Sequence, residues 1–260
     1  LVVKPYVEGM TRSEMMAIMT AGLATISGTV FAAYAAMMLP FVPGAAGHLA
    51  AASIMSAPAA LVMAKLLVPE TGEPVTAGRL TEDVERPDVN VIDAAARGAA
   101  EGLRLALLVG AMLIAFIALV AMLNGLIGWL GAFVGFEDLT LQGILGRAFA
   151  PVAWLLGVTW ADAGFIGTAI GVDLVLNEFV AYVQLSDALA SGAAADPRSL
   201  VIAIYALTTF ANFGSVAMTI AGIGAIAPSR RHELAELGLR ALAAGLLASF
   251  MTAAVAGMLV

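Results

Sequence analysis

A carboxylate inside an apolar stretch is the strongest chemical signal in the sequence. Glu178 follows Asn177 and separates two apolar runs, 163–176 and 179–185. Each run is too short to cross a bilayer, which takes about 20 residues as a helix. Two short apolar arms that meet at a polar tip predict a re-entrant hairpin. An acid at membrane depth is by default a functional group, although it can also be a structural acid neutralised by a neighbour.

The residue types at this tip favour a ligand that carries hydroxyl groups. An ionised Glu178 only accepts hydrogen bonds, whereas Asn177 both donates and accepts them. Asn212 and Ser215 form a second polar pair in an apolar run, and their spacing of three places them on one face of a helix. The same residue types also serve as hydrogen-bonding links between membrane helices. Phe210, nearby, could stack on a planar ligand or pack in a core.

A third candidate site is suited to a cation. Thr25 and Ile26 lie in a Gly/Ser/Thr-rich stretch within an apolar run. A hydroxyl and a carbonyl freed at a helix break are the oxygen ligands that hard cations prefer. The alternative is a packing face of hydroxyl residues.

The sequence gives little support to catalysis. It has no Cys and two His, and it contains no metal-ligand spacing, Ser/His/Asp arrangement or Walker-type loop. An intramembrane enzyme that uses Glu178 as acid and base would need a second acid or base beside it. No His or metal cluster stands nearby in sequence, and Asp173, on the first arm of the hairpin, is expected to be a solvated or capping residue. We therefore expect a protein that is not an enzyme.

The composition is that of an integral membrane protein. The chain is 62% hydrophobic and 12% charged, whereas soluble domains carry about 25% charged residues. Its 27 glycines suit closely packed helices. The net charge of −7 argues against binding of nucleic acid.

Uncharged runs mark the elements that position the candidate residues. We expect spans at 15–39, 49–68, 105–136, 199–229 and 241–260, with the hairpin at 163–185. The charged stretch 69–97 predicts an exposed loop. Residues 139–158, with Arg147 and Pro151 among apolar residues, predict a helix along the membrane surface.

Positive charges give the expected orientation. With Arg230 and Arg231 on the inner side, alternating spans place most of the basic residues inside as well: Lys4, Arg12, Lys65, Arg79, Arg86 and Arg97. Arg147 and Arg198 fall outside. A short segment followed by a broken helix occurs twice, at 1–37 and at 179–227. In this orientation the first copy opens inward and the second outward, which predicts an inverted repeat. Paired discontinuous helices with a site at mid-membrane are typical of transporters.

Several motifs occur in the order found in one transporter family. They are Tyr34 with 52–59 and 69–74, the Asn-Glu-Phe-Val-Ala-Tyr run 177–182, 205–207 with 210–215, 224–231, and 251–253. Together, and over essentially the whole chain, they resemble the concentrative nucleoside transporters. The resemblance implies an all-α integral membrane protein, an inverted-repeat transporter with re-entrant hairpins and discontinuous helices.

The resemblance also implies a function and a set of site residues. It implies a multi-pass protein of the cell inner membrane, a homotrimer that takes up nucleosides by alternating access with sodium as the coupling ion. A proton-coupled nucleoside or nucleobase transporter is the alternative. The implied roles are ribose binding by Glu178, Asn212 and Ser215, with Asn177 beside them, lining of the substrate site by Phe210, a nucleobase contact by Val30, and a partial sodium site at Thr25 and the Ile26 carbonyl.

The family's first hairpin tip, a Gly-Gln-Thr/Ser-Glu-Ala-Pro run, is missing here. The chain opens with Leu1 to Pro5, which reads as the middle of an element, so we expect a fragment that does not transport alone. Purine or pyrimidine preference cannot be read from it. The expected organisation is a single transport domain, 1–260, in six parts: a first-repeat remnant at 1–68, a cytoplasmic loop at 69–97, a long scaffold helix at 98–136, an interfacial helix at 139–158, the second hairpin and broken helix at 159–227, and a last transmembrane helix at 231–260.

Overall fold

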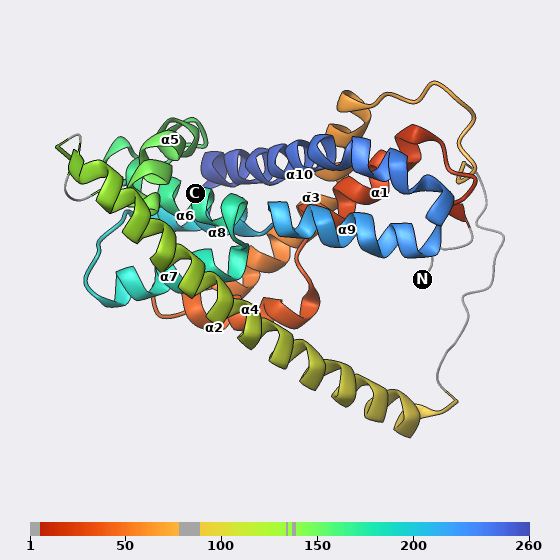
Figure 1. Cartoon of the computed structure of the whole chain (residues 1–260), viewed down its shortest axis with the longest axis horizontal. Helices are drawn as coiled ribbons and strands as arrows, with labels where there is room; N and C mark the ends of the chain where they lie inside the picture. Colours follow the sequence, from red (N-terminus) through yellow and green to blue (C-terminus); the bar gives the residue numbers. More distant parts are fainter. Residues whose placement is uncertain (1–5, 78–88, 134, 137–138) are drawn as a thin grey trace. The chain divides into compact units, whose positions relative to one another are not determined.

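Every element in the described part of the chain is a helix, as expected for an all-α protein. The computed structural model describes residues 6–77, 89–133, 135–136 and 139–260 (Figure 1). The start of the expected first segment, 1–5, and residues 78–88 of the expected loop at 69–97 lie outside the described residues. The described residues fall into two compact units, one containing the long helix α4 and one containing all the others.

The first unit is built on a single continuous helix. α4 spans Val91–Phe133, 43 residues, or roughly 65 Å at 1.5 Å per residue. Asn90 begins it by accepting hydrogen bonds from the N–H groups of Ile92 and Asp93. The chain turns back after the helix, where the Leu141 N–H donates to the Asn124 side chain at 2.8 Å. The helix is about twice as long as the 30 Å hydrocarbon core requires.

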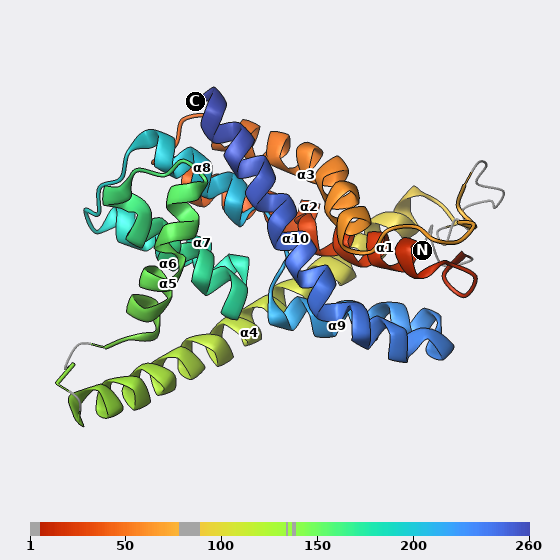
Figure 2. The same ribbon diagram turned by 90° about the horizontal axis from the view of Figure 1, so that it is seen from above.

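The second unit is centred on the C-terminal helix. α10 (Arg231–Leu259) packs against α1 (Arg12–Ala24), α3 (Ala45–Leu67), α8 (Pro197–Leu207) and α9 (Phe213–Ile226), and Figure 2 shows it crossing the middle of this unit. Within the described residues, two helices are long and apolar enough to cross a membrane, α3 and the helical stretch Pro228–Leu259. A third crossing is counted if α5 (Leu141–Leu155) and α6 (Trp160–Val175), bent by 117° at their junction, form one span.

The structure contains the two expected discontinuous helices. The first consists of α1 and α2 (Gly28–Met38), and the second of α8 and α9. The breaks lie at residues 25–27 and 208–212, where expected Ser, Thr and Asn residues stand, and the expected glycines lie in the flanking helices. The two breaks are joined directly, because the Leu23 carbonyl at the end of α1 accepts hydrogen bonds from the Phe210 N–H at 2.8 Å and the Thr209 hydroxyl at 3.0 Å.

The expected helical hairpin is also present. α6 and α7 (Glu178–Ala190) pack against each other and are linked at Leu176 and Asn177. The arms have 16 and 13 residues, so each is shorter than a full span. Asn177 begins α7, since its side chain accepts the Val180 N–H at 2.9 Å. The polar tip therefore has a structural reason, namely that a new helix starts there and needs a cap.

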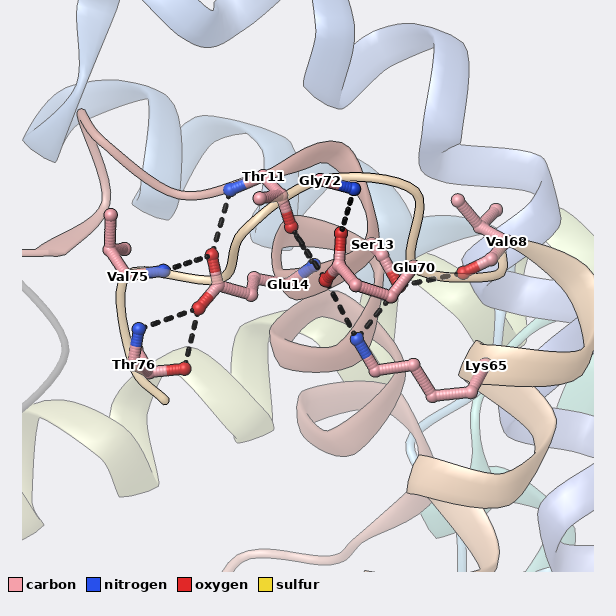
Figure 3. A network of polar contacts seen from close by, with 9 residues as sticks. All are labelled: Thr11, Ser13, Glu14, Lys65, Val68, Glu70, Gly72, Val75 and Thr76. Atoms are coloured by element: carbon pink, nitrogen blue, oxygen red, sulfur yellow. Dashed lines mark hydrogen bonds and ion pairs between the residues drawn. The ribbon is translucent and has the colours of Figure 1, made fainter. Parts of the chain in front are cut away.

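A polar network fixes the segment that follows α3 (Figure 3). The Glu14 carboxylate accepts hydrogen bonds from the N–H groups of Thr11, Val75 and Thr76 and from the Thr76 hydroxyl. Beside it, Glu70 accepts from the Thr11 hydroxyl at 2.9 Å and pairs with Lys65 at 3.2 Å. The start of the stretch expected to be a loop is thus held against the beginning of α1.

Close packing of α6 on α5 depends on glycine. A Cβ at Gly167 would lie 2.7 Å from the Ala150 nitrogen and 2.8 Å from the Phe149 carbonyl carbon, both backbone atoms. We expect Gly167→Ala to destabilise the full-length protein by about 1–3 kcal/mol through overpacking, and to lower the Tm of the purified protein in detergent. Gly164→Ala is the matched control, because its Cβ would meet nothing within 4 Å. Equal Tm values for the two variants would contradict the packing argument.

The Glu14 network predicts a pH-dependent stability. Burial opposes ionisation of Glu14, but the hydrogen bonds from Thr76, Thr11 and Val75 outweigh it and lower its pKa from 4.5 to about 2. A lowered pKa stabilises the fold above pH 4.5, and this contribution is lost as the pH falls toward 2. Glu14→Gln should therefore lower the Tm at neutral pH, and the gap to the unmodified protein should close on acidification. The exposed Glu73→Gln should show no gap at either pH.

Candidate functional site

A buried polar cluster joins the hairpin tip to both discontinuous helices. Glu178, the first residue of α7, accepts a hydrogen bond from the Tyr34 hydroxyl at Oε1 (3.1 Å) and from the Asn212 amide at Oε2 (3.3 Å). All three side chains are buried, with Glu178 5% exposed. Tyr34 comes from the first discontinuous helix and Asn212 from the second. The structure thus brings together Glu178 and Asn212, which the family resemblance assigns to one ribose-binding set.

Ser215 belongs to the same cluster through Asn212. The Asn212 Oδ1 accepts hydrogen bonds from both the Ser215 N–H and the Ser215 hydroxyl, each at 2.9 Å. Asn212 is thereby the N-cap of α9. Because its oxygen is committed to this cap, its amide hydrogens are left for Glu178. The spacing of three residues therefore reflects a helix cap rather than two positions on the same face of a helix.

The N-termini of two helices meet at the Glu178 carboxylate. Glu178 opens α7, and its partner Asn212 caps α9. The N-terminal end of a helix carries a partial positive charge that stabilises an anion. A carboxylate offers about four acceptor positions, and the two side-chain donors among the described residues occupy only part of them. The cluster can therefore hold a polar ligand that supplies further donors.

Aromatic side chains pack against Tyr34, which donates to the carboxylate. The Tyr34 ring stacks on Tyr182 with centroids 4.5 Å apart, and Phe179 lies tilted at 6.0 Å. The Tyr182 hydroxyl donates to the Ile204 carbonyl at 3.1 Å. From the sequence, Tyr34 was noted only as part of a family motif. The available signal was that a buried Tyr needs a hydrogen-bond partner for its hydroxyl, but nothing local identifies that partner.

The remaining predicted substrate residues lie on the same elements. Asn177 is half-buried and uses its oxygen to cap α7. Val30 stands four residues before Tyr34 on α2, hence on the same helix face one turn away. Phe210, half-buried, lies in the second break, two residues before Asn212. The structure thus places Val30 and Phe210 near the segments that hold the cluster.

Thr25 and Ile26 lie in the first break, outside the two helices. Thr25 has an extended backbone and donates its hydroxyl hydrogen to the Ala21 carbonyl at 2.9 Å. Its oxygen lone pairs remain able to accept or to ligate. Among the described residues, no group of three or more His, Asp or Glu could hold a metal ion. Any cation here would thus depend on hydroxyl and carbonyl oxygens, which is the chemistry of a sodium ligand set.

Comparison with known proteins identifies the family. The family model described as "Na+ dependent nucleoside transporter C-terminus" matches residues 48–257. An uncharacterized transporter of Haemophilus influenzae is 46% identical over 263 residues, covering 100% of this chain and 62% of its own length. The nucleoside permease NupC of Helicobacter pylori is 41% identical over 262 residues, covering 100% of this chain and 61% of its own.

Solved structures agree with the sequence relatives. CNTnw in an inward-facing substrate-bound state superposes with a TM-score of 0.89 at 46% identity, covering 99% of this chain and 60% of that one. A substituted CNTnw in an outward-facing state superposes with a TM-score of 0.91 over 99% and 61%. The chain spans about three fifths of the length of these relatives, which are transporters or permeases rather than enzymes. With the family model covering most of its length, the chain belongs to the Na+ dependent nucleoside transporter family.

Proposed function

We propose that the full-length protein is a sodium-coupled symporter that takes up nucleosides by alternating access. The observation that carries this proposal is the Glu178 carboxylate, buried at the hairpin tip, where Tyr34 and Asn212 are its side-chain donors among the described residues. A buried carboxylate with free acceptor positions favours a ligand with hydroxyl groups. The name of the Helicobacter pylori relative and the family description support a nucleoside as that ligand.

The ribose would bind at the polar cluster. Its hydroxyls would donate to Glu178, and the Asn212 amide would orient the carboxylate or bind a hydroxyl directly. Ser215 would act mainly by fixing Asn212, because its N–H and hydroxyl are both bonded to that side chain. The base would lie against Phe210 and Val30, with Asn177 at the edge. A free nucleobase has no sugar hydroxyls and would leave this cluster without a ligand.

Sodium would bind at the first break. The Thr25 hydroxyl and the Ile26 carbonyl would supply part of the ligand set, and the Na+ dependence named in the family description supports this ion. The Leu23 carbonyl bridges this break to the second one. A cation bound at Thr25 would therefore order the backbone that also positions Asn212, which gives a physical route for coupling ion to substrate.

Alternating access would move the hairpin and the broken helices across the membrane. Discontinuous helices paired at a central site are the usual basis of this mechanism. CNTnw, a structural relative, has been captured in inward-facing and outward-facing states. The long helix α4 would be the scaffold, in a homotrimer that spans the cell inner membrane.

The direct test is transport by the full-length protein in proteoliposomes. Uptake of radiolabelled uridine and adenosine would be measured with an inward sodium gradient, without sodium, and with an inward proton gradient. Sodium-dependent uptake that unlabelled nucleosides block and free uracil does not would support the proposal. Uptake that does not depend on sodium but depends on the proton gradient would show that the proton is the coupling ion. A preference for uracil would show that the substrate is a free nucleobase.

Glu178→Gln should weaken nucleoside uptake by at least tenfold. The change keeps the size of the side chain but removes the charge that strengthens hydrogen bonds from ligand hydroxyls, each worth about 1.5–3 kcal/mol. Initial uptake rates would be measured at equal protein content. Asp187→Asn is the matched control, because Asp187 is exposed on the same helix α7. Normal uptake by the Glu178 variant would rule out this carboxylate as the ribose acceptor.

Thr25→Val should raise the sodium concentration that gives half-maximal uptake. The substitution keeps the shape of the side chain and removes its oxygen, so sodium loses a ligand. Thr20→Val is the control on the preceding helix α1, since the Thr20 hydroxyl is buried without a hydrogen-bond partner in the described part of the chain. An unchanged sodium dependence in the Thr25 variant would show that the cation binds at other residues.

A further inference from the structure

A second buried carboxylate stands across the hairpin tip from Glu178. Asp173 lies in the last turn of α6, four residues before Asn177, the N-cap of α7. It is 1% exposed, so it is buried and not solvated as expected from the sequence. Within the described residues its Oδ1 has no hydrogen-bond partner. Buried polar atoms are nearly always paired, and nothing in the proposed binding of ribose or sodium uses this carboxyl group.

Among the described residues, the groups found to act on Asp173 carry no positive charge. From α7 it interacts electrostatically with Glu178 and Tyr182, and from α2 with Tyr34. On the other helices that approach α6, Arg147 of α5 is exposed and Arg198 of α8 donates to the Gly257 carbonyl. The one described charged group that acts on Asp173 is therefore another carboxylate, Glu178.

The two carboxyl groups stand at opposite ends of helices. Glu178 opens α7, where the helix dipole and two hydrogen-bond donors favour the ionised form. Asp173 lies at the C-terminal end of α6, where the dipole is negative and disfavours an anion. Asp173 and Glu178 interact electrostatically, and two anions in a low-dielectric interior repel each other. Paired carboxylates in such surroundings divide into one ionised and one protonated group.

We propose that Asp173 is a proton-binding site, and that nucleoside uptake requires the proton held there. The ionised carboxylate takes one proton from water before the hairpin is buried, becomes a neutral carboxyl group, and leaves Glu178 as the single anion that receives the ribose. The proposal rests on the proposed function for its role in transport, but the protonation itself is independent of it.

A proton fits this position better than a sodium ion. Sodium needs several oxygen ligands around it, whereas the Asp173 Oδ1 has no polar partner within hydrogen-bond distance among the described residues. No described cluster of three acidic or His side chains surrounds it either. A proton needs one oxygen, and it removes the charge that burial disfavours.

Infrared difference spectroscopy tests the protonation directly. The purified full-length protein would be titrated with acid and base in H₂O and D₂O, and the carbonyl stretch of a protonated carboxyl group recorded. We expect a component of this band that is present at neutral pH, where exposed carboxyl groups are ionised, in the unmodified protein and in Asp187→Asn, and the loss of that component in Asp173→Asn. A band that survives in Asp173→Asn, or is missing from the unmodified protein, overturns the assignment whether or not the protein carries nucleosides.

The pH dependence of transport tests the role. At constant sodium, uridine uptake by the unmodified protein should fall with rising external pH, approaching about tenfold per pH unit on the alkaline side for a single protonation. Asp173→Asn imitates the protonated group, so its uptake should persist at alkaline pH. Asp187→Asn should follow the unmodified profile. Identical pH profiles for Asp173→Asn and the unmodified protein would refute the role in transport, while absence of uptake from all proteins would refute the proposed function instead.

Discussion

The two discontinuous helices complete each other's backbone hydrogen bonds where they break, and the site depends on this contact. The Leu23 carbonyl lies in the last turn of α1, where helical partners run out, and it accepts from the Phe210 N–H and the Thr209 hydroxyl. An unsatisfied backbone group costs several kcal/mol in lipid. One break can therefore exist at membrane depth because the other meets it there.

The residues that complete hydrogen bonds at the helix ends are also those proposed to bind the ligand. α9 begins where the second break ends, and it needs an N-cap. Asn212 provides this cap with its side-chain oxygen, and its side-chain NH₂ donates to Glu178. Ending the hairpin turn requires a cap for α7, and the residue after that cap is Glu178 itself. Each polar residue at the centre thus satisfies a helix terminus first, and only its remaining hydrogen-bonding capacity is available to a ligand.

The sequence alone was sufficient for the local features of this arrangement. Apolar runs too short to cross a bilayer predicted the hairpin, and Gly, Ser, Thr and Asn within longer runs predicted the breaks. Pairings between distant segments could not be read, such as Tyr34 with Glu178 across 144 positions or Glu14 with Thr76 across 62, since no periodicity encodes them. The division of the chain into two units was not predicted either, because it is defined by tertiary contacts.

The bonds that hold Glu178 are suited to exchange with a ligand. At 3.1 Å from Tyr34 and 3.3 Å from Asn212, both are slightly longer than their usual ranges. They orient the carboxylate without saturating it, so a ligand hydroxyl can add to or replace a protein donor at little cost. A tighter set of internal bonds would stabilise the empty site more and leave less free energy for binding. The long bonds are therefore consistent with a carboxylate that the fold positions for a partner it does not itself contain.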